Sequence, residues 1–443
     1  MKKVIALAGL CLLPYTYASA EGYQVNAQST RQGGMGHVGT AMKLGAESMH
    51  FNPAGLGFLD KQIDISAGVT GVFAKATFKD GDYKHQSDND PSTPLFAYAG
   101  FKIYDFLSAG ISINNPYGSS IDWGKNWKGA HLIQDISLKA FSVQPTLAWK
   151  ITDRLSVGAG MMIMFGNIEL NRSFISSADL AAVAMANPNA APLAEKYKDI
   201  TPLSVGISGS SDIRLGYNVG AMFDINDKVT IGASFRSKVN MKVAEGDVAL
   251  TYANEMELKP VLEGVPPLDR AYFHAQLPLP SNFNIGVSYQ PTTQWILSGE
   301  VQFVGWGAYE KLDIHFIPEN TLGIYDQSAR KEYKNTRIYR LGAQYGLTSR
   351  MDLRLGAYLD ETPVKDDYLN PETPSMNKLG LSAGFSFRPV DRFSIDLSFT
   401  YVTGFGRDGS YTDKSLVTGM DRNFGGHYQT RAYMPSIGLR YLY

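Results

Sequence analysis

The 443-residue sequence predicts an all-β protein, a 14-stranded antiparallel transmembrane β-barrel with an N-terminal plug, or hatch, inside the lumen. Three observations support this prediction. Stretches of alternating apolar and polar residues recur along the chain, short turns alternate with long loops, and a Gly-rich segment without alternation precedes the first strand. Only 19% of the residues are charged, below the roughly 25% typical of soluble domains, while 12% are aromatic and 44 are Gly. The net charge of −1 gives no indication of a nucleic-acid partner.

Residues 1–20 predict a secretory signal peptide. Two lysines precede an apolar run that ends at Leu13, and small residues before Glu21 predict the cleavage point. The apolar run is too short to span a bilayer. The single cysteine, Cys11, follows Leu10 instead of the small residue expected before a lipoprotein cysteine, so we interpret it as part of the signal. The mature chain then contains no thiol and no disulfide.

The next segment, residues 21–61, predicts the plug. It is rich in Gly and small side chains, which pack densely and turn sharply. Fourteen strands enclose a lumen that inward side chains alone do not fill. We therefore expect residues 21–61 inside the barrel and residues 62–443 in its wall.

The wall is predicted from alternation and from its connections. In residues 295–303 and 393–401 every second residue is apolar, which gives each strand one apolar and one polar face. Very short polar turns lie at 104–105, 152–154, 226–228, 291–293, 348–350 and 390–392. Long polar connections lie near 80–93, 119–132, 173–208, 246–270, 315–333, 360–375 and 404–426. Six turns and seven loops join fourteen strands and place both ends of the wall on the turn side.

Closure follows from the membrane environment, because an open sheet edge in hydrocarbon leaves its backbone groups unsatisfied. Strands such as 133–150 and 154–172 exceed the roughly 9–11 residues needed to cross, so we expect the barrel to project beyond the membrane on the loop side. A secreted β-sandwich or propeller is the alternative, but it has no reason to sort its loops by length.

The chain ends in a strand over 436–443, with aromatic or aliphatic residues at 437, 439, 441 and the terminal Tyr443. This pattern resembles the signal by which outer-membrane barrels are recognised by the barrel-assembly machinery, which we therefore expect as a partner. The alternative is an ordinary half-buried strand.

Several motifs resemble the FadL/TodX family of outer-membrane transporters of long-chain fatty acids and other hydrophobic compounds. Residues 22–26, which include Gly22, Tyr23 and Asn26, resemble the start of the family's hatch, and Asn52, Pro53 and Ala54 resemble its rigid corner. Further matches at 279–286, 306–312, 339–342 and 354–364 keep the same order and spacing. The resemblance implies a multi-pass protein of the outer membrane of a Gram-negative bacterium, which passively transports a hydrophobic small molecule.

The third strand, 107–118, ends in residues that disfavour regular pairing. Pro cannot donate to a ladder, and Asn and Gly favour kinks. The residues concerned are Asn114, Asn115, Pro116, Tyr117 and Gly118. Either the strand ends there and a loop begins or, as the resemblance implies, an inward kink opens a lateral hole through which cargo reaches the outer-membrane lipid.

Two long loops contain apolar residues, which predict one or two short helices over 176–197 and, by resemblance, helices within 246–270. Leu180 and Val183 lie in the first, and Leu262 and Val265 lie in the second. These helices either cap the mouth of the barrel or, as the resemblance implies, form an apolar groove where ligand lands. The resemblance also assigns Trp306 to the ligand site.

A fatty-acid carboxylate in the lumen needs a cation or several donors. By resemblance these lie near the ends of the fifth and ninth strands, where Arg172 and Lys311 are the nearest basic residues, although Gly166 and Asp313 occupy the equivalent positions. The alternative is that Arg172 and Lys311 are solvated strand ends.

No catalytic or metal-binding motif emerges. The seven histidines are scattered, and neither a Gly-x-Ser-x-Gly elbow nor a phosphate-binding loop occurs. We therefore expect no enzyme activity, no metal and no cofactor, and a monomer. A water-filled porin and a structural or adhesin barrel remain the rival functions.

Overall fold

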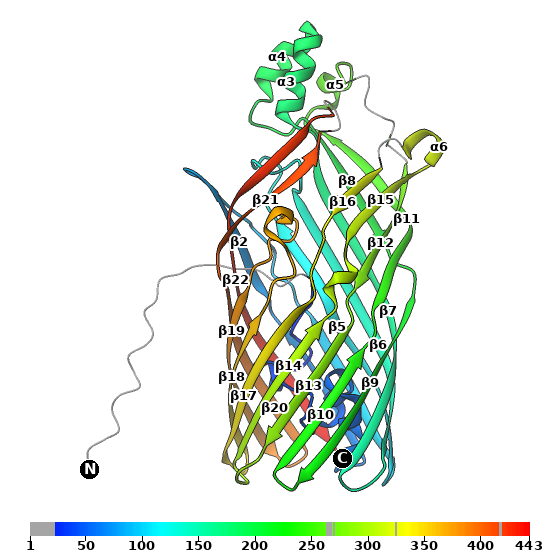
Figure 1. The fold of residues 1–443 in the computed structure, drawn as a ribbon, viewed down its shortest axis with the longest axis vertical. Helices are drawn as coiled ribbons and strands as arrows, with labels where there is room; N and C mark the ends of the chain where they lie inside the picture. The colour runs from blue at the N-terminus through cyan, green and yellow to red at the C-terminus, as the bar shows by residue number, and fades with distance from the viewer. Residues whose placement is uncertain (1–22, 263–267, 269–270, 324–325, 416–418) are drawn as a thin grey trace, which may run out of the picture.

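The computed structural model describes residues 23–262, 268, 271–323, 326–415 and 419–443 (Figure 1). The predicted signal peptide lies outside these residues. The chain forms one antiparallel sheet that closes on itself into a tall barrel, with short helices above its rim and further short helices at its lower end.

The barrel wall has fourteen antiparallel crossings, as predicted. Six crossings are single strands: β5 (Leu107–Asp122), β6 (Asp135–Lys150), β7 (Leu155–Ile175), β18 (Met351–Asp360), β19 (Lys378–Val390) and β22 (Asp421–Leu442). The others consist of two strands in succession. These are β1 (Ile63–Thr70) with β2 (Phe73–Asp80), β3 (Tyr83–Gln86) with β4 (Leu95–Tyr104), β8 (Leu203–Ser210) with β9 (Arg214–Asn226), β10 (Val229–Arg236) with β11 (Val239–Tyr252), β12 (Tyr272–Leu279) with β13 (Asn282–Tyr289), β14 (Trp295–Val304) with β15 (Lys311–Ile317), β16 (Gln327–Arg330) with β17 (Thr336–Thr348), and β20 (Phe393–Gly404) with β21 (Arg407–Lys414).

Closure is made between the first and last crossings. Strand β22 pairs with β20 on one side and with β1 and β2 on the other. Ile63 and Tyr443 exchange two backbone hydrogen bonds of 2.9 Å, so the last residue of the chain completes the seam. All six short turns join strands where the sequence predicts them, at the lower end of the barrel in Figure 1.

The strands continue well into the segments predicted as long loops. β11 reaches Tyr252, and β21 pairs with β22 inside the predicted 404–426 loop. In β11 the buried side chains of Val239, Met241, Val243 and Val248 alternate with more exposed ones, so the inner face of this strand is packed like that of the strands below it. The loop prediction is therefore wrong at the strand ends, and the third strand in particular runs past Gly118 to Asp122.

The helices are short. Below the rim lie α1 (Thr30–Gly33), η1 (Gly45–Glu47), α2 (Ser48–Phe51), η2 (Pro53–Phe58), η4 (Trp306–Ala308) and η6 (Asp366–Tyr368). Above it lie α3 (Ser177–Ala186), η3 (Pro188–Ala190), α4 (Ala191–Lys196), α5 (Glu255–Leu258) and α6 (Glu319–Leu322). Among the described residues, no helix is long and apolar enough to cross a membrane.

The outward face of the barrel is apolar and carries aromatic residues beside the short turns. Tyr104 stacks on Phe106 with centroids 5.5 Å apart, and Trp295 lies 4.8 Å from Tyr345. The exposed aromatic side chains near this end also include Trp149, Tyr289, Tyr441 and Tyr443. An aromatic girdle of this kind marks the membrane–water interface of outer-membrane barrels.

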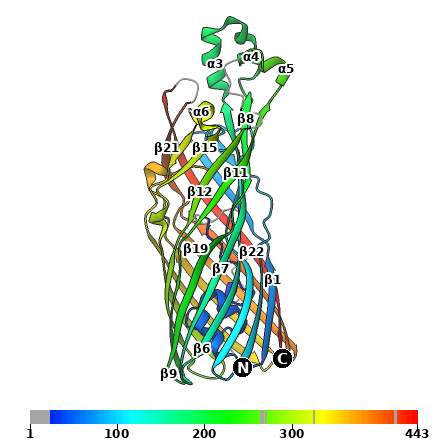
Figure 2. The same cartoon turned by 90° about the vertical axis from the view of Figure 1, so that its right-hand side faces the viewer.

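Residues 23–61 contact strands around the whole circumference of the barrel. In two perpendicular views their helices lie within the outline of its lower part (Figures 1 and 2). Inward polar side chains of many strands bond to their backbone: Gln144 and Asn218 donate to Met49 O, Ser156 to Ala54 O, Ser234 to Phe51 O, Thr400 to Gly33 O, and Ser382 accepts from Gly36 N.

A belt of inward-facing glycines accommodates this segment, which we call the hatch. At each of these glycines an added Cβ would meet hatch atoms at about 3.5 Å or less. The belt consists of Gly100, Gly110, Gly158, Gly220, Gly232, Gly286, Gly342, Gly356, Gly384 and Gly438. The wall therefore lies close enough to the hatch backbone to leave no room for side chains at these positions.

Candidate functional site

The third crossing contains an irregularity where the sequence predicts one. β5 pairs with β4 only up to Asn114, and its pairing with β6 shifts register between Asn114 and Tyr117, so Asn115 and Pro116 form a bulge. Pairing with β6 then resumes and continues to Asp122. The strand thus neither ends at these residues nor stays regular, because Pro116 cannot donate to the ladder and the chain continues beyond it.

The start of the hatch occupies the place that β4 leaves beside this bulge. Val25 N donates to Pro116 O at 3.1 Å, and Gly118 N donates to Tyr23 O at 2.8 Å. Gln28 adds a side-chain bond of 2.7 Å to Asn115 O. Residues 23–25 therefore bond to β5 as a short extra strand, at the one stretch where β5 has no partner from β4.

A cavity of about 510 Å³ lies at the same place in the wall. Its lining includes buried, lumen-facing residues such as Tyr358 and Val402, and also Lys139 and Phe141, which lie on the outward face of β6. Gln24, Val25 and Asn26 line it as well. The cavity thus reaches from the lumen side of the wall to its outer side, with the hatch terminus beside it.

Aromatic residues hold the first described residue of the hatch. The ring of Tyr23 meets Trp306 edge-on with centroids 4.7 Å apart, and Tyr309 and Tyr117 lie 5.8 and 6.3 Å away. Trp306 is buried in η4, where the ninth crossing is interrupted between β14 and β15. Tyr23, Trp306 and Tyr117 therefore meet in the lumen, whereas Gly22 lies outside the described residues.

The predicted corner of the hatch is a fully buried side chain with every bonding group used. Asn52 Nδ2 donates to Thr40 O at 2.7 Å and to Ala221 O of β9 at 3.0 Å, while its Oδ1 accepts from Ala54 N at 3.1 Å. Asn52 thereby caps η2, and Pro53 occupies the first helical position, which needs no backbone donor. The corner is thus bonded both to the hatch and to the wall.

A second, small polar chamber of about 30 Å³ lies between the hatch and the wall. Glu300 of β14, Arg340 of β17 and Arg236 of β10 line it together with His37 and His50 of the hatch. Glu300 Oε2 accepts from Gly39 N and Thr40 N at 3.0 and 2.8 Å, and its Oε1 lies 3.4 Å from Arg340 Nη1. Sequence reasoning missed this chamber, although alternation does place Glu300 on the polar face of its strand.

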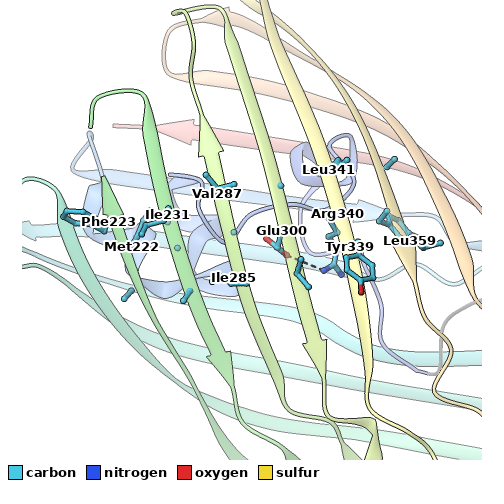
Figure 3. Close-up of a pocket in the computed structure, with 18 of the residues that line it drawn as sticks. Met222, Phe223, Ile231, Ile285, Val287, Glu300, Tyr339, Arg340, Leu341 and Leu359 are labelled. Atoms are coloured by element: carbon cyan, nitrogen blue, oxygen red, sulfur yellow. Dashed lines mark hydrogen bonds and ion pairs between the residues drawn. The ribbon is translucent and has the colours of Figure 1, made fainter. Parts of the chain in front are cut away.

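Another hollow lies on the outward face of the wall, so it is not a lumen site. About 930 Å³ lies over strands β9 to β18 among the exposed side chains Phe223, Ile231, Ile285, Val287, Tyr339, Leu341 and Leu359 (Figure 3). The hollow forms because Gly299 and neighbouring alanines have side chains too small to fill the space between these larger ones. Glu300 and Arg340, joined by the dashed line in Figure 3, belong to the inner face behind it.

The loop residues proposed for ligand capture lie mostly inside a packed cluster. Leu180 and Leu262 are buried, Val183 is half-buried, and Val265 lies outside the described residues. Ser176 caps α3 in a capping box with Asp179, whose carboxylate also bonds Ser415. The exposed apolar side chains of this helical cap are instead Met185 and Met256, which are 89% and 88% exposed.

The two candidate cations face opposite ways. Arg172 shares the parity of the buried Leu170 and Phe174, and its Nη2 donates to Gln327 Oε1 at 3.0 Å, so it lies on the inner face near the mouth. Lys311 is 58% exposed and pairs with Asp313 at 2.7 Å. Strand alternation thus turns the Lys311 side chain outward and the Arg172 side chain inward, and a role of either residue in ligand binding stays a prediction.

No group of three or more His, Cys, Asp or Glu side chains among the described residues is arranged to hold a metal ion. A closed barrel with an apolar outer band and an aromatic girdle is a Gram-negative outer-membrane β-barrel protein.

Comparison with known proteins identifies the kind of barrel. Residues 12–443 match the family model described as outer membrane protein transport protein (OMPP1/FadL/TodX), so the chain belongs to this family. Its members are outer-membrane transport channels for hydrophobic compounds and are not enzymes.

The chain aligns with relatives and with solved structures over nearly its full length. A putative outer membrane protein of Neisseria meningitidis serogroup B is 25% identical, with 100% of this chain and 98% of the relative covered. The long-chain fatty acid transport protein of Salmonella typhi is 20% identical, with 90% and 91% covered. A FadL homologue of Pseudomonas aeruginosa has a TM-score of 0.78 at 19% identity, covering 95% and 99% of the two chains. The toluene transporter TodX of P. putida has a TM-score of 0.69 at 14% identity, covering 97% and 99%.

Proposed function

We propose that this protein carries hydrophobic molecules, long-chain fatty acids first among them, passively through the outer membrane. Cargo is captured at the helical loops, enters an apolar site in the lumen around Trp306, and leaves sideways into the outer leaflet after the hatch moves. Lateral release keeps an apolar molecule out of the aqueous periplasm until it has reached lipid.

The observation that carries this proposal is the interrupted wall at β5. A bulge at Asn115 and Pro116, a cavity lined from both sides of the wall, and residues 23–25 of the hatch bonded beside it occur together. Among the described residues, two backbone hydrogen bonds join residues 23–25 to β5, and the Tyr23 ring also packs against Trp306, so displacing this stretch breaks few backbone bonds but must release the Tyr23 ring. The remainder of the hatch is fixed by the glycine belt and by Asn52.

The cargo class follows from relatives whose names specify a ligand. One is a long-chain fatty acid transport protein and another a toluene transporter, so fatty acids and aromatic hydrocarbons are the two candidates. An inward arginine at the mouth, Arg172, favours the acids, because a carboxylate in the lumen requires a cationic partner.

The direct experiment restores regular pairing at the bulge. Replacing Asn115→Thr together with Pro116→Val supplies the missing backbone donor and two strand-forming side chains. Uptake of a labelled long-chain fatty acid by whole cells should then be lost, while the purified variant still binds the acid. Unchanged uptake with a folded barrel would contradict lateral release.

The rival functions predict other results. A water-filled porin conducts ions in planar bilayers without hydrophobic ligand, whereas a barrel closed by a hatch conducts little. A structural or adhesin barrel shows neither conductance nor uptake. We further propose that the protein is a monomer and that its C-terminal strand, ending in Tyr443, is recognised by the barrel-assembly machinery.

A further inference from the structure

The polar chamber between the hatch and the wall contains more positive charge than its own residues neutralise. Among the described residues that line it, Glu300 is the only carboxylate, and two backbone amides and Arg340 already bond to it. Arg236 Nη2 donates to His50 O at 2.6 Å and lies 3.1 Å from His50 Nδ1. In the part of the chain that the structure describes, Arg236 forms no ion pair with a carboxylate.

Burying a guanidinium without a counter-ion is costly, so the environment of Arg236 favours an anion. Buried polar atoms without a hydrogen-bond partner around the chamber also favour a bound anion. Arg340 is 2% exposed and its Nε has no acceptor, and the buried His37 Nε2 is likewise without a partner. Two guanidinium groups with spare donors are the arrangement that binds a carboxylate.

The chamber is small as it stands, with room for only one or two water molecules. One of its walls is the start of the hatch, since Gln24, Val25 and Asn26 line both this chamber and the cavity in the barrel wall. Asn26 Oδ1 accepts from Arg340 Nη2 at 3.2 Å, and the amide of Gln24 reaches Gln302 at 3.5 Å. When residues 24–26 move, the two spaces become one.

We propose that this chamber binds the carboxylate of an acidic hydrophobic cargo, with Arg340 and Arg236 as its partners. The carboxylate takes the bond that Arg340 gives to Asn26 and supplies the counter-ion that Arg236 lacks, while the acyl chain lies in the adjoining wall cavity. An acid thus displaces the start of the hatch by direct competition, whereas a neutral hydrocarbon has no group that does so. This inference rests on the proposed function.

The test compares oleate with oleyl alcohol, which has the same chain without the charge, for binding to the detergent-purified full-length protein by equilibrium dialysis. The wild type should bind oleate about tenfold or more tightly than the alcohol, the ratio expected from a charge-assisted hydrogen bond. Arg236→Gln should bring the ratio close to one without changing the affinity for the alcohol, and Arg236→Lys should keep most of the preference.

Arg154→Gln is the matched control, because Arg154 is an exposed arginine beside a short turn that pairs only loosely with Asp227 at 3.5 Å. It should leave both affinities unchanged. Equal affinities of the wild type for acid and alcohol would overturn the inference, and this comparison stands even if Arg236→Gln fails to fold. Competition by acetate at the concentration of oleate would overturn it too, because the site would then accept any anion. Binding of neither ligand would count against the proposed function itself.

Discussion

The fit between the hatch and the glycine belt leads to a sharp prediction at Gly356. A Cβ at this residue would lie 2.0 Å from Gly36 N and 2.1 Å from Met35 C. Ordinary contact begins near 3.4 Å, so the hatch backbone must move by about 1.4 Å to admit Gly356→Val. β18 is bonded to strands on both sides, which leaves the hatch as the part that yields.

Overpacking of a well-packed site costs about 1–3 kcal/mol, which raises the population of a displaced hatch by about 5- to 150-fold. We expect ion conductance of the purified barrel in planar bilayers to increase by a factor in this range. The matched control is Gly299→Val on the outward face, where a Cβ would lie 3.3 Å from the flexible end of Leu341 and 3.9 Å from Arg340 O. Equal conductance of Gly356→Val and Gly299→Val, with both barrels folded, would refute the close fit between hatch and wall.

Three further results are expected. Asn52→Ala removes the side-chain donor to Thr40 O and Ala221 O, which should destabilise the hatch by about 1–3 kcal/mol. Hydrogen exchange should become faster in residues 30–58, while exchange in the wall strands stays unchanged. Burial lowers the pKa of His131, in the loop between β5 and β6, to about 4. As the pH falls, His131 is protonated in the unfolded loop before it is protonated in the folded loop. The stability of the folded loop should therefore be constant above about pH 6.5 and should fall between about pH 6.5 and 4. Hydrogen exchange of residues 123–134 measures this pH dependence, and His131→Phe should abolish it. Asn115→Thr with Pro116→Val should abolish uptake yet leave oleate affinity within about twofold, and a parallel loss of both would indicate a misfolded lumen instead.

Much of the barrel could be predicted because a lipid environment imposes a regular pattern on sequence. Alternation identified strands such as 295–303, and the short turns were located correctly because only a few polar residues fit between strands. The upper ends of β11 and β21 lie in polar stretches that were predicted as loops, although the residues of β11 alternate between buried and exposed along the strand.

The candidate site was predicted less completely, for a different reason. Pro116 predicts an interruption of the strand, because proline has no backbone donor. The shape of the interruption depends on the bonds that Tyr23 and Val25 form with β5, and these join residues far apart in sequence. The face on which Lys311 lies could not be read from the sequence, because a shift of one residue in strand register reverses the face of every side chain. Neither Arg236 nor Arg340 was predicted as a site residue, because inward charges on separate strands resemble ordinary polar positions until the fold brings them together.

The central claim is that the start of the hatch must leave β5 for cargo to pass. Gln24 and Tyr117 are directly paired across the antiparallel bridge between hatch and strand, at a separation that suits a disulfide. The only native cysteine, Cys11, lies in the predicted signal peptide, so Gln24→Cys with Tyr117→Cys introduces a unique pair. Cells that carry this double variant should fail to take up labelled oleate when the disulfide is formed, and a reducing agent should restore uptake. Equal uptake with the disulfide formed and reduced would contradict the proposed route.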